Sequence, residues 1–187
     1  MDALSLLENR VSFSKLGGEA PTPEQRALFW KAAMRAPDHG GIHPWRFIEV
    51  EGEARMRLGE VFAQVAMEND PDAAPEFLEK CLNMPLRAPL LIVVVACYSE
   101  NPKVPRFEQM LSAGAAAQNI LLSAFAQGLG AIWRTGWVAE DASISRALGL
   151  KENEQNIGML YVGQPAQAVP SAPVLNAADH VSQWKGE

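Results

Sequence analysis

The segment from Met34 to Val50 concentrates residue types that can hold a flat, polar ligand. Arg35 and His39 flank a short Ala-Pro-Asp turn, two glycines follow, and Pro44-Trp45 leads into an alternating strand pattern. Loops this rich in Pro, Gly, His and Arg are costly to order unless they shape a site. The pattern predicts a rigid binding loop between a helix end and a strand start.

Two other arginines are candidates for holding an anion. Arg10 and Ser12 lie two positions apart, so in an extended segment both side chains point the same way and can bind one phosphate. Arg134 ends an apolar strand directly after Trp133, and a guanidinium is costly to bury unpaired. The structural alternatives are a solvated surface position for Arg10 and an internal salt bridge for Arg134.

The sequence gives little support for a metal site, a dinucleotide-binding motif or a catalytic side chain. His39 and His43 have the spacing of two zinc ligands on a helix, but the glycines between them and Pro44 oppose a helix, and no third ligand is near. Gly128 and Gly130 follow a helix rather than a strand, which indicates a helix cap and not a dinucleotide fingerprint. Because no catalytic triad or activated cysteine is recognisable, we expect no metal and no catalytic protein residue, and a cofactor would carry any redox chemistry.

Composition bounds the class of protein. The 187 residues suit one domain spanning 1–187, and the formal charge of −6 argues against nucleic acid as a partner. The uncharged run 109–133 contains polar residues and glycines, which favours a buried helix and strand over a membrane span. Since the N-terminus lacks the features of a signal peptide, we expect a cytoplasmic protein.

Helices and strands alternate without the regular rhythm of a doubly wound sheet. Helices are expected at 2–9, from 23 to before Pro37, at 53–67, up to about 83, at 112–127 and at 141–148; strands are expected at 47–50, 88–96, 131–134 and 157–162. In the first helix the leucines are expected to turn inward. Small residues early in the helix at 112–127 would let a second helix approach closely. The Pro- and Ala-rich tail from about residue 166 is either loose or wrapped around a partner subunit.

Taken together, these segments resemble the flavin-dependent nitroreductase family. The likeness rests on three ordered stretches and is strongest to the short, single-domain NAD(P)H nitroreductases of bacteria: Asn9-Arg10-Val11-Ser12, Arg35-Ala-Pro-Asp-His39 with Pro44-Trp45-Arg46-Phe47, and Gly130-Ala-Ile-Trp-Arg-Thr-Gly136. The resemblance implies an α+β fold with a mixed central β-sheet flanked by helices. It also implies an intertwined homodimer with FMN at each subunit interface.

The resemblance also implies roles for individual residues. Arg10 and Ser12 match the family's phosphate contacts, Arg134 matches a second one, and Arg35 and His39 match residues that reach the flavin from the partner subunit. The remaining matches are flavin contacts in the strand (Trp133, Thr135), the position between the phosphate contacts (Val11), and a stretch associated with NAD(P)H (Ser123, Ala124, Phe125, Ala126, Gln127, Gly128). The family often has Arg or His where this chain has Val11, so one polar contact is missing.

The implied activity is hydride transfer from NADH or NADPH to FMN, followed by reduction of a nitroaromatic or quinone-type acceptor in a ping-pong cycle. Flat, electron-poor acceptors suit a flavin ring, and such a cycle needs no protein nucleophile. Three alternatives stay open: another reaction on the same fold, such as reductive dehalogenation or flavin turnover; a flavin sensor with little turnover; and a structural dimer without flavin.

Overall fold

The apolar run near residue 90 forms the centre of the sheet. In the computed structural model, which describes residues 2–186, this run is β3 (Leu90–Cys97), and its residues 90–96 are all buried. β2 (Trp45–Glu51) and β5 (Glu154–Pro165) pair with it, while β4 (Gly130–Arg134) and the short β1 (Leu16–Gly17) pair with β5. A strand buried on both faces requires a covering layer on each side of the sheet.

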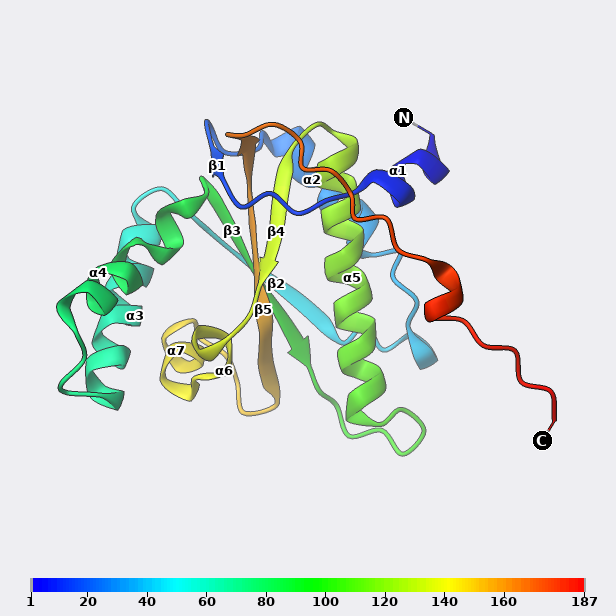
Figure 1. The fold of residues 1–187 in the computed structure, drawn as a ribbon. Coiled ribbons are helices and arrows are strands. Elements are labelled where there is room, and N and C mark those ends of the chain that lie inside the picture. The colour runs from blue at the N-terminus through cyan, green and yellow to red at the C-terminus, as the bar shows by residue number, and fades with distance from the viewer. Residues whose placement is uncertain (1, 187) are drawn as a thin grey trace.

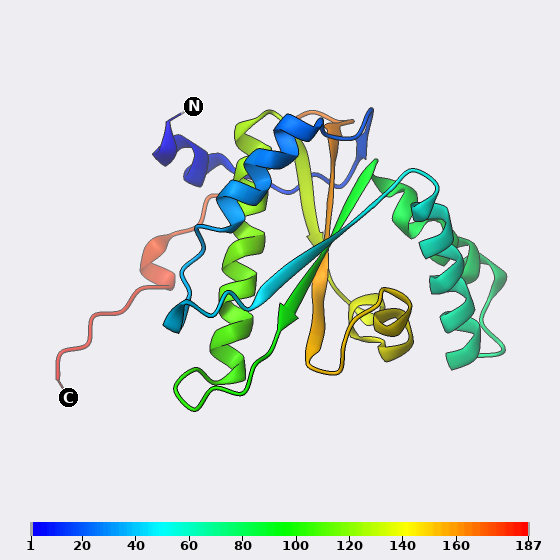
Figure 2. The ribbon, with the colours of Figure 1, turned by 180° about the vertical axis from the view of Figure 1, so that it is seen from behind.

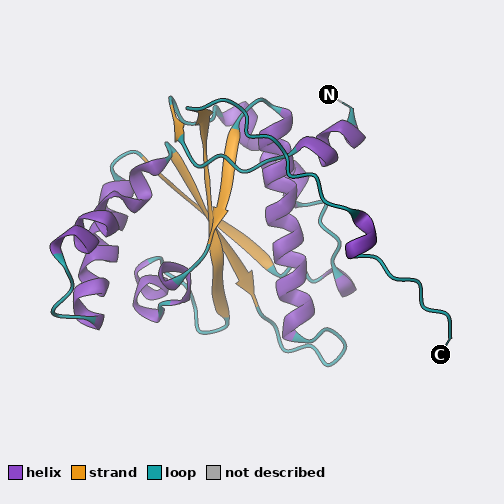
Figure 3. Ribbon diagram, in the orientation of Figure 1, coloured by secondary structure: helices purple, strands orange, loops and turns teal. Residues whose placement is uncertain are grey.

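Helices supply those two layers. In Figure 1, α5 and α2 cover one face, and α3, α4, α6 and α7 lie over the other; Figure 2 shows the same layers from behind, and Figure 3 separates helices from strands by colour. The helices are α1 (Ala3–Asn9), α2 (Pro23–Ala33), α3 (Ala54–Asn69), α4 (Pro75–Asn83), α5 (Arg106–Ala126), α6 (Trp137–Glu140) and α7 (Ala142–Ala147), with short 3-10 turns η1 (His39–Gly41), η2 (Met84–Arg87) and η3 (Ala177–Asp179).

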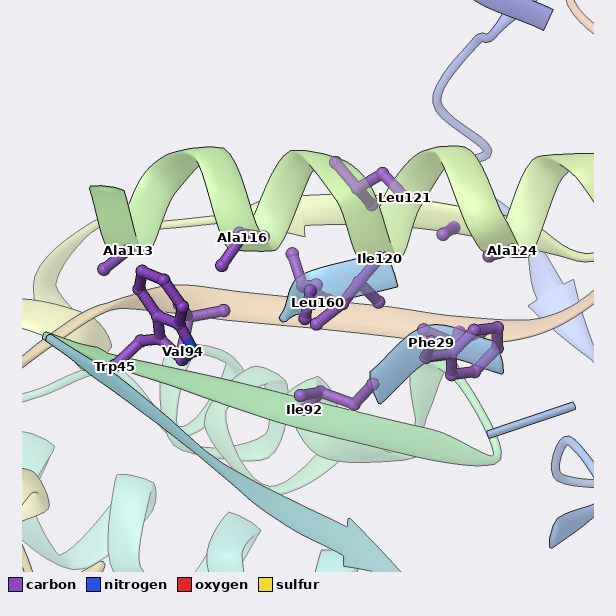
Figure 4. Close-up of a cluster of buried hydrophobic side chains, with 14 of the residues drawn as sticks. Phe29, Trp45, Ile92, Val94, Ala113, Ala116, Ile120, Leu121, Ala124 and Leu160 are labelled. Atoms are coloured by element: carbon purple, nitrogen blue, oxygen red, sulfur yellow. The ribbon is translucent and has the colours of Figure 1, made fainter. Parts of the chain in front are cut away.

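Alternation along β3 divides the core into two clusters. Ile92 and Val94 face α2 and α5, where small residues of α5 such as Ala116 let the helix lie close to the sheet (Figure 4). Leu91 and Val93 face the opposite way, into the cluster built on α3. Burial on this scale, at roughly 25 cal/mol per Å² of apolar surface, fixes the strand ends that carry the candidate site.

The predicted α+β architecture with a helix-flanked sheet is confirmed, but the expectation of a mixed sheet is wrong for the described chain. All four strand pairings are antiparallel. β3 and β4 are joined through α5 and run parallel to each other, as a helical crossover favours. β5 lies hydrogen-bonded between them, so the two parallel strands never become neighbours.

The helix cap expected at Gly128 is confirmed. Thr22 caps α2 in a reciprocal pair with Gln25, and Gly128 ends α5 with a φ of 76°. The inward orientation expected for the first helix is wrong, because Leu4 and Leu7 are 70% and 60% exposed. This helix has only seven residues and no buried side chain, so it projects from the body rather than packing into it.

The C-terminal tail leaves the body of the molecule (Figure 1). From Ala166 to Gly186 its regular structure is limited to η3, and Val174 and Trp184 are 100% and 85% exposed. Within residues 2–186, no helix is both long and apolar enough to cross a membrane.

Candidate functional site

The Arg10–Ser12 segment is anchored beside β4. The Phe13 N–H donates to the Ala131 carbonyl at 3.0 Å, immediately after the segment. Val11 is buried, whereas Arg10 is half-buried and Ser12 is exposed. This alternation leaves the two polar side chains accessible together. It also explains the missing polar residue at position 11, because that side chain belongs to the protein interior.

Arg134 ends β4 as a cation without an internal partner. Its Nε is enclosed and has no hydrogen-bond partner, and among residues 2–186 its guanidinium forms no ion pair. The nearest aromatic ring is that of Tyr161, whose centre lies 5.6 Å from the guanidinium carbon. Burial raises the pKa of the Tyr161 phenol, so the ring stays neutral and cannot balance the charge. The internal salt bridge considered for Arg134 is therefore absent from the described residues, and the site suits an anionic ligand.

Trp133 is held by an irregularity in β5. The register of β3 against β5 shifts between Val94 and Val95, and the indole N–H of Trp133 donates to the Ile157 carbonyl at 3.2 Å. Gly158 follows with a φ of 130°, and a Cβ built there would lie 2.1 Å from the indole nitrogen. The bulge and the glycine together fix the direction of the strand that carries Arg134.

The other side of the indole faces α5. A Cβ built on Gly114 would meet the Trp133 ring at 3.7 Å, an ordinary contact distance. The small residues that open α5 thus receive a side chain from the same subunit. Thr135 follows the strand, is exposed, and precedes Gly136, whose φ is 96°.

The Arg35–His43 loop contains three residues with positive φ and an internal hydrogen bond. Gly40 and Gly41 have φ values of 77° and 64°, and His43 also adopts a positive φ of 50°. The Asp38 carboxylate accepts the His43 N–H at 2.6 Å, which holds the turn closed. The two histidines serve different neighbours, because the His43 ring lies 5.7 Å from the Trp45 ring and His39 contacts Glu108. No cluster of three potential metal ligands occurs within residues 2–186.

The described chain does not gather all the predicted contacts at one point. Arg134 ends β4, and the segment that carries Arg10 and Ser12 is joined to the same strand through the Phe13 N–H. Figures 1 and 2 both place η1, which begins at His39, on the outer side of α5. Arg35 is exposed and follows the end of α2.

The stretch from Ser123 to Gly128 has a structural role at the far end of α5. The Gln127 amide donates to the Gln25 carbonyl of α2 at 3.3 Å, Ala124 lies in the core, and the Phe125 ring is 6.4 Å from that of Phe13. These contacts fasten α2 and the N-terminal segment to α5. The proposed association with NAD(P)H stays a prediction.

Two hollows help to locate where a ligand could lie. A cavity of about 540 Å³ is formed by α6, α7 and the start of β5, and none of the predicted flavin contacts is among its lining residues. An open groove of about 390 Å³, lined by Trp30, Met34, Phe47 and Glu49, lies beside the helix end that carries Arg35.

Sequence reasoning missed three residues that shape the site. Gly158 and Tyr161 lie on β5 and contact Trp133 and Arg134, respectively, while Glu108 on α5 contacts His39. An isolated glycine inside a strand pattern was the available signal for the bulge. The contact between Glu108 and His39 spans 69 positions and left no local signal.

An antiparallel sheet covered by helices on both faces, with an unpaired arginine at the end of β4, defines an α+β protein with a candidate anion site. A sequence profile of the Nitroreductase family matches residues 7–164. The Escherichia coli K12 protein named "Putative NAD(P)H nitroreductase YdjA" is 46% identical over 165 residues, which are 88% of this chain and 89% of that protein. The chain belongs to the nitroreductase family.

Solved structures agree on the fold. A nitroreductase-like family protein from Bacillus cereus superposes with a TM-score of 0.84 at 21% identity, covering 100% of this chain and 97% of that one. A Desulfovibrio desulfuricans protein solved in complex with FMN gives a TM-score of 0.75 at 22% identity, covering 98% and 97%. These likenesses confirm the nitroreductase-like fold expected from the sequence.

Proposed function

We propose that this protein is an FMN-dependent oxidoreductase that takes hydride from NADH or NADPH and reduces nitroaromatic or quinone-type acceptors. The observation that carries the proposal is the unpaired Arg134 guanidinium at the end of β4, with the Arg10–Ser12 segment pinned to the same strand. Two accessible cations and a hydroxyl on neighbouring backbone are the donor set that a phosphate monoester requires. The curated relative named as an NAD(P)H nitroreductase supports the choice of electron donor.

The residues fit FMN on chemical grounds. Arg134, Arg10 and Ser12 would hold the phosphate, and Trp133 and Thr135 would contact the remainder of the cofactor. FMN, when bound, supplies a ring that accepts hydride from the nicotinamide and passes electrons to the second substrate. The protein then needs only to bind, to orient and to exclude water. The proposed order is ping-pong, with the oxidised nicotinamide leaving before the acceptor binds.

A homodimer would complete the site. Arg35 and His39 are exposed, and on α5 the apolar side chains of Phe107 and Leu111 are 63% and 66% exposed. The exposed leucines of α1 and the apolar residues of the tail add to this unburied surface. Burying them against a second copy would bring the Arg35–His39 loop to the partner's FMN. We expect a dimer by light scattering, and we expect deletion of residues 166–187 to weaken it.

Purified protein tests the cofactor first. A yellow protein, or an apoprotein that binds added FMN with quenched flavin fluorescence, supports the proposal; a protein that does neither contradicts it. Anaerobic mixing with NADH and with NADPH then separates a reductase from a sensor, because bleaching of the flavin absorbance by either donor requires hydride transfer. Bleaching by neither donor would favour a binding role.

A panel of acceptors separates the reactions that the fold allows. Nitroaromatics and quinones should reoxidise the reduced protein under anaerobic conditions. Halogenated phenols or free flavin as the preferred acceptors would favour the alternative reactions. The region 68–83, which includes α4, is the natural place to look for the determinant, because no feature of its sequence selects one acceptor.

A further inference from the structure

The imidazole of His39 is held by a carboxylate from a distant part of the chain. Its Nδ1 lies 2.5 Å from Oε2 of Glu108, which belongs to the first turn of α5. Within residues 2–186, no group is hydrogen-bonded to Nε2, so the other ring nitrogen is available to a ligand.

The carboxylate stands on an unusually fixed helix start. The neighbouring residue, Gln109, is buried, and its side chain makes three hydrogen bonds: to the N–H and the carbonyl of Ser99 at 3.0 and 2.9 Å, and to the carbonyl of Val104 at 2.8 Å. These bonds tie the first turn of α5 to the connection that precedes it. Glu108 therefore presents its carboxylate from backbone that has little freedom.

The imidazole stands on a turn that is fixed from two sides. A Cβ built on Gly40 would meet Cγ2 of Val104 at 3.3 Å, so η1 lies directly against the segment that enters α5. On the other side, Asp38 accepts the His43 N–H. The His39–Glu108 contact thus joins two elements that are already positioned, and it selects an orientation of the ring at little cost in entropy.

A carboxylate accepts hydrogen bonds only, so Nδ1 of His39 must carry the proton in this contact. In the neutral ring Nε2 is then an acceptor. We propose that Glu108 is a positioning residue that fixes the orientation and tautomer of His39 and presents Nε2 to the flavin site. The inference rests on the proposed function, in which His39 contacts FMN held mainly by a second copy of the chain.

Stability alone does not account for the pair. The side chains of His39 and Glu108 are 58% and 32% exposed, and exposed ion pairs contribute little to folding. A solvent-exposed hydrogen bond can still orient a side chain that contacts a ligand, because the orientation depends on hydrogen-bond geometry rather than on burial. The carboxylate–histidine arrangement that orients metal ligands works in the same way.

The tautomer can be measured directly and without cofactor. The chain has three histidines, so ¹⁵N-labelled rings can be assigned with single His substitutions, and long-range ¹H–¹⁵N spectra distinguish the tautomers at about pH 9, where free imidazole is neutral. We expect Nδ1–H for His39 in the wild type and in Glu108→Gln, whose amide oxygen still accepts a proton. Glu108→Ala should lose this preference. An Nε2–H ring in the wild type would overturn the proposal.

FMN affinity tests the consequence for binding. Glu108→Ala should raise the Kd about 2- to 10-fold, the range for one hydrogen bond, and Glu108→Gln should stay near the wild type. In a His39→Ala background, Glu108→Ala should have no further effect, because its action passes through the ring. The matched control is Glu76→Ala, which also removes a glutamate from the first turn of a helix, α4, far from His39 in the sequence.

The outcomes separate this inference from the proposed function. If the wild type does not bind FMN, the proposed function fails while the tautomer experiment still decides the role of Glu108. If FMN binds and His39→Ala weakens it, but Glu108→Ala does not, the positioning role is wrong and the flavin site stands. Equal loss for Glu108→Ala with and without His39 would mean that Glu108 acts only on the structure of α5, which also contradicts the proposal.

Discussion

Replacing Arg134 by methionine should separate ligand binding from folding. Methionine keeps an unbranched stem that ends near the position of Nε and removes the charge. Because Arg134 has no internal partner, no salt bridge must be broken before it binds an anion. The full contribution of a hydrogen-bonded charge, about 1.5–3 kcal/mol, should therefore appear as FMN affinity, which corresponds to a Kd raised roughly 10- to 100-fold.

The apoprotein should respond in the opposite direction. The substitution forfeits a distant cation–π contact, worth about 0.5 kcal/mol at 5.6 Å, but it relieves an enclosed Nε whose unpaired burial costs about 1–3 kcal/mol. We expect the free energy of unfolding of the apoprotein to be unchanged or to rise by about 1 kcal/mol. Urea unfolding monitored by tryptophan fluorescence measures this, and titration of the refolded apoprotein with FMN measures the affinity.

Arg46→Met is the matched control. Arg46 makes two hydrogen bonds to Glu154, at 2.8 and 2.7 Å, and the Glu154 side chain is only 5% exposed. Removing this partnered arginine leaves a buried carboxylate unpaired, so the apoprotein should lose stability while its intrinsic FMN affinity is retained. The reasoning is refuted if Arg134→Met behaves like Arg46→Met, losing apoprotein stability with an unchanged Kd for FMN.

Three further substitutions follow from contacts in the site and its supports. Arg10→Ala should weaken FMN binding by about 1.5–3 kcal/mol in a fluorescence titration, and an unchanged Kd would remove Arg10 from the site. Gly158→Ala should lower the free energy of unfolding by about 2–4 kcal/mol and shift the tryptophan emission, because the added Cβ collides with Trp133 and needs a φ of 130°; wild-type values for both would contradict the bulge. The Arg46 hydrogen bonds lower the pKa of Glu154 from 4.5 to about 2, so this pair stabilises the fold fully above about pH 4.5 and less as the pH falls toward 2. Glu154→Gln should remove about 2 kcal/mol of that acid-dependent stability in urea unfolding curves, and unchanged acid sensitivity would show that the pair does not control it.

Local signals in the sequence predicted much of the framework. The apolar run of β3 and the glycine stop after α5 each depend on neighbours within a few residues, and each was located correctly. The pairing of the sheet was not predictable in this way. Whether the parallel strands β3 and β4 become neighbours depends on where β5 inserts, which is decided by packing over the whole chain.

In the candidate site, too, residue types could be predicted from the sequence, whereas contacts between distant segments could not. Arg10, Ser12 and Arg134 could be identified from the sequence as candidate phosphate contacts, because a phosphate requires cations and hydroxyls on accessible backbone. That Arg134 is unpaired could not be known from the sequence, since every nearby carboxylate was a possible partner until the fold placed it. The orientation of α1 was mispredicted because periodic leucines indicate an apolar face without saying which surface, in the same chain or another, will cover it.

The long helix α5 is the element that relates the two halves of the candidate site. Near its start Glu108 holds His39, and less than two turns later Gly114 leaves room for Trp133, the residue before Arg134. Both groups are therefore fixed to one rigid element, about 120° apart around its axis. A single copy can orient the two sets of contacts without joining them, and a second copy related by two-fold symmetry could place the Arg35–His39 loop of one chain against the Arg134 site of the other. If each site needs both chains, flavin binding and dimerisation are thermodynamically linked. FMN should then lower the dissociation constant of the dimer. A variant that weakens the dimer should raise the Kd for FMN even when every phosphate contact is intact.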